Sequence, residues 1–264
     1  QTHKVSLPKP YEYNHTVGLG VLYLPDAEGT EYQFLNMICQ GVSFQIVFVL
    51  REGAGMPTSK QCYDTFMDQW AGHYGYCKVL RCDRGLHNRG VFCRELESAG
   101  VRVKNGGLEA PWQIGKTERE GGIWKDIARK VIHQKKVTGF DELKLLCQEV
   151  NAVRNDMART GGFAPSQWVF GALPRRGAGE QFDAEEWADI GASQARADGQ
   201  GEFAKRCEYR QAAKEAFVQV DSSSRIQRAL CRKAAPMLGT YKVGDIVSFQ
   251  RDRDARTEED RWQR

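Results

Sequence analysis

Residues 79–85 read VLRCDRG, a short apolar run that ends in the acid Asp83, with Gly85 two residues later. An apolar run that closes on an acid and a glycine predicts a strand with a carboxylate at its carboxyl end. Residues 115–119 read GKTER and follow a glycine-rich stretch, so Glu118 falls in the first turn of a predicted helix. The two acids are 118 − 83 = 35 residues apart. They can converge on one divalent cation, because Mg²⁺ and Mn²⁺ prefer carboxylate oxygens.

Both acids have a competing interpretation. Asp83 could simply cap the turn after its strand, although Gly85, Asn88 and the downstream spacing to Glu118 favour a functional site. Glu120 competes with Glu118 as the helical acid. The two lie about 200° apart around a helix, so only one can face a metal, and the GKTER context favours Glu118.

The order of these motifs resembles the catalytic core of retroviral and retrotransposon integrases. The resemblance covers most of residues 14–175: a first strand at 17–24, a hairpin at 36–50, a helix at 59–75, the segments 83–88 and 111–119, and the motifs at 164–166 and 170–171. It implies an α/β, ribonuclease H-like fold, in which helices flank a mixed five-stranded sheet. It also implies a metal-dependent polynucleotidyl transferase that integrates DNA, with Asp83 and Glu118 as catalytic ligands of Mg²⁺ or Mn²⁺.

One position departs from the family, which carries a further Asp in the first strand where this chain has Gly20. Glycine offers no metal ligand and weakens a strand. Asp26 is a poor substitute, because it lies six residues on, roughly 20 Å along an extended strand, in a turn-like segment. Two-metal phosphoryl transfer needs a carboxylate that bridges both ions, and the resemblance assigns that role to the missing Asp. We therefore expect impaired catalysis and weakened metal binding.

Basic residues surround the predicted helix. Residues 102–136 hold nine Lys and Arg against four acids, and Lys125 and Arg129 fall at i+7 and i+11 from Glu118, on one helical face. With Lys116, and with Gln113 from the glycine-rich loop that contacts DNA in the family, they are the predicted DNA-binding residues. The alternative is that these cations only solvate the helix. Residues 203–233, with eight Lys and Arg against three acids, form a second basic candidate.

The other side of this helix is apolar. Ile123, Ile127 and Val131 recur at i, i+4 and i+8 and should face the core. For Trp124 we predict burial against the sheet rather than stacking on a base.

The remaining elements follow from periodicity. Strands are predicted at residues 18–24, 33–39, 43–50, 78–82 and 101–104, and helices at 59–74, 88–98 and 141–155. Short turns predict that the first three strands form an antiparallel meander, while the helices between later strands imply parallel crossovers. Asp141 is the predicted cap of the last helix.

Composition changes beyond Pro174. We expect a lead-in at residues 1–13, the core at 14–174, and a linker with a charged helical segment at 175–235, broken near 221–224. Residues 236–264 resemble the opening of the SH3-like barrel that follows the core in integrases, and they are too few to complete it. The zinc-binding amino-terminal module of the family is missing as well, so we expect a truncated copy.

The 264 residues carry a net charge of +4 and no apolar run near the roughly 20 residues of a membrane span. The eight cysteines form no Cys-x-x-Cys pair, which predicts reduced, buried thiols. These features predict an intracellular protein, nuclear if functional.

Three functions are consistent with these observations. The first is an integrase core that joins DNA ends. The second is a catalytically dead descendant that binds DNA or self-associates, and the third is a relic with no retained role. Gly20 favours the second or third, whereas the intact pattern elsewhere argues against long neutral decay. The expected partners are DNA and, because integrases act as multimers, further copies of the chain; no membrane is expected.

Overall fold

A computed structural model describes residues 11–53, 55–82, 85, 90–105, 115–174, 202–231, 249–250 and 262–263. Contacts divide the chain into two units, Gln1–Asp221 and Ser222–Arg264. The first unit contains the sheet and its helices. In the second, the strands β6 (Phe249–Gln250) and β7 (Trp262–Gln263) form an antiparallel pair. The predicted SH3-like region falls largely outside the described residues.

The first unit is built on a five-stranded sheet in the order β3-β2-β1-β4-β5. Its strands are β1 (Thr16–Pro25), β2 (Glu31–Cys39), β3 (Gln45–Glu52), β4 (Val79–Cys82) and β5 (Arg102–Asn105). The first three form an antiparallel meander, and β4 and β5 continue the sheet in parallel from β1. This topology confirms the predicted mixed five-stranded sheet.

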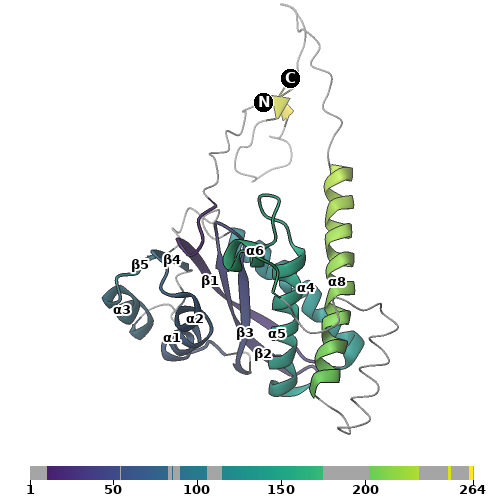
Figure 1. The fold of residues 1–264 in the computed structure, drawn as a ribbon, viewed down its shortest axis with the longest axis horizontal. Helices are drawn as coiled ribbons and strands as arrows, with labels where there is room; N and C mark the ends of the chain where they lie inside the picture. The colour runs from purple at the N-terminus through teal and green to yellow at the C-terminus, as the bar shows by residue number, and fades with distance from the viewer. Residues whose placement is uncertain are drawn as a thin grey trace, which may run out of the picture. The chain divides into compact units, whose positions relative to one another are not determined.

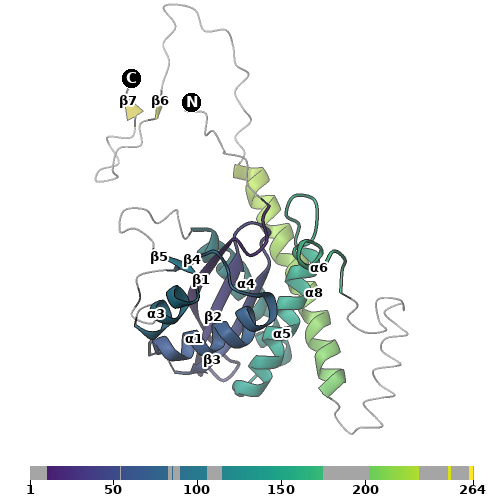
Figure 2. The same ribbon diagram turned by 60° about the vertical axis from the view of Figure 1, so that its left-hand side comes forward.

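Helices cover both faces of the sheet (Figures 1 and 2). One face packs against α4 (Gly115–Lys135) and α5 (Gly139–Met157), and the other against α1 (Ser59–Phe66), the π-helical turn η1 (Met67–Ala71), α2 (Gly72–Tyr74) and α3 (Val91–Ser98). A short helix, α6 (Pro165–Phe170), follows α5. Because side chains alternate across a strand, β2 sends Phe34 to the α4 side and Leu35 to the α1 side.

The long helix α8 (Glu202–Cys231) packs beside α4 and α5 through its residues up to Asp221. Tyr209 and three alanines are buried there, while Arg210 contacts the buried Glu149 of α5 at 2.7 Å and Lys205 contacts Glu142 at 2.7 Å. Two of the basic residues in 203–233, Lys205 and Arg210, thus form ion pairs with acids of α5.

Two local predictions were wrong. The predicted break at residues 221–224 does not occur, because α8 runs through it. Asp141 does not cap α5, which begins at Gly139 after the cap residue Thr138, so that Asp141 lies in the first turn. An acid there still interacts favourably with the positive end of the helix dipole.

The seven cysteines whose side chains are described form no disulfide with one another, and most are buried, as predicted. Burial raises the pKa of Cys77 to about 12, so that this thiol stays protonated at neutral pH. None of the helices in the described ranges combines the length and apolar character that a bilayer crossing requires.

Candidate nucleic-acid and metal site

Gly20 lies in β1, where it pairs with Asn36 of β2 on the sheet face that α4 covers. A Cβ built at Gly20 would meet Thr117 Cγ2 of α4 at 3.7 Å, which is an ordinary van der Waals contact. Position 20 therefore faces the first turn of α4 and has room for the first atom of a side chain.

Two other glycines let α4 approach the sheet so closely. A Cβ at Gly18 would lie 2.0 Å from Thr117 Oγ1. On the helix, a Cβ at Gly121 would lie 2.9 Å from Asn36 Nδ2 and 3.0 Å from Leu22 Cδ2. A larger residue at either position would force the side chains of Thr117, or of Asn36 and Leu22, to move.

Asp83 lies outside the described residues, but the strand that leads to it is described. β4 ends at Cys82, and its parallel register with β1 pairs Gly18 with Arg81. Gly20 and Asp83 each follow this pair by two residues in the sequence. Gly85 is described, but glycine has no side chain, so its position says nothing about how Asp83 could bind a metal.

The two acids of α4 have different surroundings. Glu118 is exposed in the first turn. Glu120 is turned toward α5, where it forms an ion pair with the buried Arg154. The roles that the resemblance gives to the acids of α4 at a metal stay predictions. Within the described ranges, no three His, Cys, Asp or Glu side chains form a cluster that could hold a metal ion.

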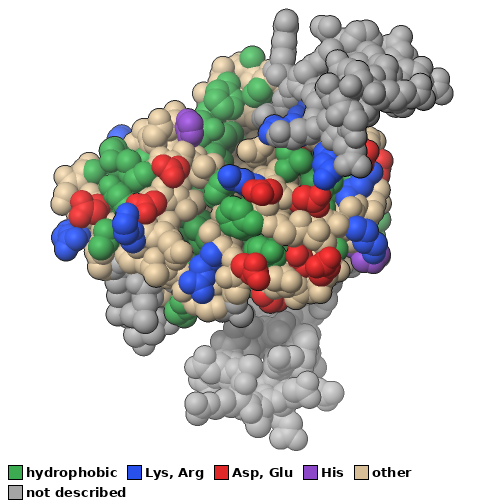
Figure 3. Space-filling model, turned by 90° about the horizontal axis from the view of Figure 1, so that it is seen from below, with side chains coloured by type: hydrophobic (Ala, Val, Ile, Leu, Met, Phe, Trp, Pro, Cys, Tyr) green, Lys and Arg blue, Asp and Glu red, His purple; other side chains and the backbone are tan. Residues whose placement is uncertain are grey.

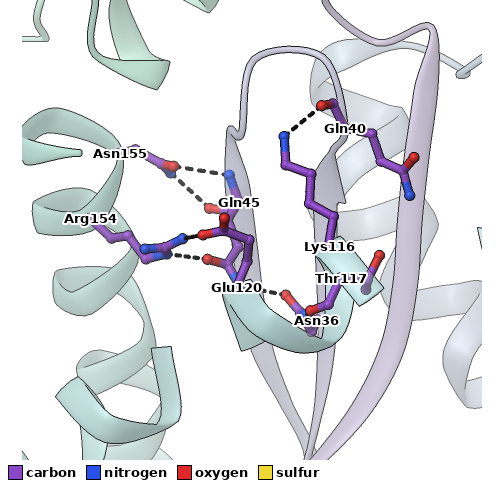
Figure 4. Close-up of polar contacts among 8 residues, drawn as sticks. All are labelled: Asn36, Gln40, Gln45, Lys116, Thr117, Glu120, Arg154 and Asn155. Carbon is purple, nitrogen blue, oxygen red and sulfur yellow. Dashed lines mark hydrogen bonds and ion pairs between the residues drawn. The ribbon is translucent and has the colours of Figure 1, made fainter. Parts of the chain in front are cut away.

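A buried polar network fixes the first turn of α4 to the sheet (Figure 4). Asn36 Nδ2 donates to the Thr117 carbonyl oxygen at 3.2 Å, and Gln45 Nε2 donates to Asn36 Oδ1 at 2.7 Å. Arg154 then donates to both Gln45 Oε1 and Glu120. Desolvation lowers the pKa of Arg154 and the charge of Glu120 opposes that shift. The chain of contacts joins α5 to the backbone beside Glu118.

Sequence reasoning missed this network. Its only local signal is that Asn36 and Gln45 are polar residues at buried positions of largely apolar strands. Because buried polar groups need partners, such residues predict a network without identifying its other members.

The predicted DNA-binding residues that are described all lie on α4. Lys116 is half-buried, and its Nζ donates to the Gln40 carbonyl oxygen at 2.5 Å. Lys125 is half-buried, and its pKa is lowered by desolvation and by the neighbouring charge of Arg129. Arg129 is exposed and contacts Asp126 at 3.4 Å. Gln113 lies outside the described residues.

The apolar side of α4 behaves as predicted. Ile127 and Val131 are fully buried, and Ile123 is partly buried against the same cluster. Trp124 is buried, and its Nε1 donates to Asn151 Oδ1 of α5 at 2.9 Å, so it is a core residue rather than a platform for bases. Asp26 is equally structural: its carboxylate accepts hydrogen bonds from the backbone N–H groups of Glu28, Thr30 and Gly139.

Basic and acidic side chains are mixed on one face of the surface. On the face drawn in Figure 3, lysine and arginine side chains alternate with acidic and hydrophobic ones. This mixed face differs from a nucleic-acid interface, where cations cluster.

The five-stranded sheet with helices on both faces is similar in fold to a chain of a solved retroviral intasome. A chain of the simian T-cell lymphotropic virus intasome, solved in complex with the PP2A regulatory subunit B56 gamma, matches with a TM-score of 0.53 and 14% identity over 66% of this chain. The match spans 62% of that chain.

The HTLV-2 integrase catalytic core domain, solved in complex with magnesium in trimeric and dimeric forms, matches with a TM-score of 0.49 and 15% identity. These matches cover 61% and 62% of this chain and 99% of each core-domain chain. No protein-family model and no curated protein sequence matches the chain.

Proposed function

We propose that this chain is an integrase-type core that binds DNA and has lost, or nearly lost, phosphodiester transfer. The single observation that carries the proposal is Gly20. This residue faces the first turn of α4 and has no side-chain atom that could bind a metal. The strand register supports a place for Asp83 beside it, because Gly18 pairs with Arg81 two residues earlier in each strand.

Metal ligands are too few for the family's chemistry. Of the three positions that the resemblance assigns to metal, Asp83 and Glu118 carry carboxylates and Gly20 carries no ligand atom. Two-metal catalysis needs a carboxylate shared by both ions. A donor set without it does not fit a two-metal centre, so we derive no catalytic step through Mg²⁺ or Mn²⁺.

DNA binding is supported by the cations of α4. Lys125 and Arg129 lie near each other on the helix that carries Glu118, and Lys116 lies at its start. Phosphate contacts of this kind carry no sequence information, so we propose duplex binding without strong base preference. Self-association and a nuclear location are part of the same proposal.

Strand transfer with Mn²⁺ tests the proposal. The native chain should be inactive, whereas Gly20→Asp should restore measurable joining, since a Cβ fits at position 20. Gly20→Asn is the matched control, because it adds nearly the same volume with a poorer ligand and should stay inactive. Equal, robust activity in the native chain and Gly20→Asp would contradict the assignment of position 20 as a lost ligand.

A further inference from the structure

The outer edge of β3 is hydrogen-bonded to two asparagine side chains of α5. At Gln45, the backbone N–H donates to Asn155 Oδ1 at 2.9 Å, and the carbonyl oxygen accepts from Asn155 Nδ2 at 2.7 Å (Figure 4). At Val47, the N–H donates to Asn151 Oδ1 at 3.1 Å, and the carbonyl oxygen accepts from Asn151 Nδ2 at 2.9 Å. Each carboxamide therefore makes the two bonds that a residue of a neighbouring antiparallel strand would make.

The spacing of the helix matches that of the strand. The two asparagines are four residues apart, about 6 Å along a helix, and the two strand residues that they bind are two apart, roughly 6.8 Å along a strand. One turn earlier on α5, burial raises the pKa of the Cys147 thiol, and a hydrogen bond from the Val49 backbone opposes that shift. Three successive turns of α5 thus follow three alternate residues of β3.

These contacts bury an edge of the sheet. β3 and β5 are the two edges in the strand order, and Gln45 and Val47 are 1% and 0% exposed. Buried backbone N–H and C=O groups need partners, which the asparagines supply here. At the opposite edge, β5 is only four residues long and carries the exposed Arg102 and Lys104. Short length and charge are another way to keep an edge strand from pairing with a further chain.

We propose that Asn151 and Asn155 seal the β3 edge against strand addition, and that the partner they exclude is β3 of a second copy of this chain. Residues 45–50 read QIVFVL, a run of high β-propensity without charge or proline, which is typical of segments that pair between chains. Two copies of one edge strand can pair antiparallel about a twofold axis. The seal depends on neither DNA nor metal, and it directs any self-association of the native chain to another surface.

Asn151→Leu combined with Asn155→Leu tests the seal on the full chain, because leucine has a similar shape and removes the four bonds. In dilute solution the Gln45 and Val47 amides of this variant should exchange with deuterium roughly tenfold faster than in the native chain. At higher concentration, light scattering should show dimers that the native chain does not form. In those dimers both amides should be protected again, because the strand of the second copy binds them.

Two variants control for effects other than the open edge. Gln148→Leu adds the same apolar side chain at an exposed position of α5 and should behave like the native chain. Gly18→Ala strains the contact between β1 and α4 and leaves both asparagines in place, so it shows whether lost stability alone causes association.

Thermal melting checks that the variants fold. If the double variant is too unstable, Asn155→Leu decides alone, since Asn151 also accepts a hydrogen bond from Trp124. The Gln45 amide should then exchange faster, while Val47, still bound by Asn151, should exchange as in the native chain.

The proposal is overturned if the double variant keeps the native mass at every concentration, or if it associates while the Gln45 and Val47 amides stay unprotected. Equal association of Gly18→Ala would also overturn it, as would unchanged exchange at Gln45 in Asn155→Leu. All of these results leave DNA binding intact. Failure of the native chain to bind duplex DNA would overturn the proposed function and leave the seal standing.

Discussion

Gly18 of β1 and Thr117 of α4 are in such close contact that a Cβ at position 18 would lie 2.0 Å from the Thr117 hydroxyl oxygen. At Gly20, two residues along the strand, the corresponding distance to Thr117 Cγ2 is 3.7 Å. The same helix therefore excludes a side chain at one glycine and accepts it at the other.

Gly18→Ala should destabilise the fold by about 1–3 kcal/mol, the usual range for overpacking. Gly20→Ala should be close to neutral. Chemical denaturation of both variants measures the difference. Thr117→Ala should reduce the cost of Gly18→Ala, because it removes the clashing oxygen; strictly additive effects would contradict the contact.

Gly20→Asp should also change how the protein responds to metal. With a carboxylate at position 20, Mn²⁺ should raise the melting temperature, since an ion that binds only the folded state stabilises it. The native chain and Gly20→Asn should show a much smaller rise. A thermal shift of equal size in all three proteins would show that position 20 is not part of a metal site.

Glu120→Gln should be strongly destabilising, because it leaves Arg154 charged and buried without its partner. Removal of one member of a buried ion pair typically costs about 3–5 kcal/mol. Urea unfolding measures the loss. Glu118→Gln provides the control, since Glu118 is exposed and its loss should change stability little.

Lys125→Glu combined with Arg129→Glu should weaken duplex binding and flatten its salt dependence, because two phosphate contacts become repulsive. The fold should survive, since the surface pair of Arg129 with Asp126 contributes little. Titrations at several salt concentrations measure the slope. Unchanged binding would move the contact to other basic residues of the chain.

The packing of α8 should weaken in acid. Burial alone would raise the pKa of Glu142, but hydrogen bonds from Lys205 and the Thr138 N–H outweigh it, so the pKa lies below its ordinary value. A depressed carboxyl pKa contributes stability above the unfolded value of about 4.3, and this contribution is lost as pH falls through the folded value. Unfolding free energies across this window should show a smaller acid loss in Glu142→Gln than in the native chain.

The sequence by itself determined much of this protein. Apolar alternation and short apolar runs predicted all five sheet strands, because a strand buried on one face alternates and a strand buried on both faces is continuously apolar. The apolar stripe of α4, with Ile127 and Val131, followed equally from helical period. The absence of a carboxylate at Gly20 is also purely a sequence fact.

Tertiary structure alone decided what surrounds that glycine. The convergence of Arg81 and Lys116 on Gln40 joins residues that are 41 and 76 positions from it along the chain. The ion pair of Glu120 with Arg154 likewise spans 34 positions. The periodicity of the sequence shows which face of a strand or helix a residue occupies. The partner that it meets on that face depends on the register of the strands and on how the helices cross. Only the packed structure fixes those long-range relations.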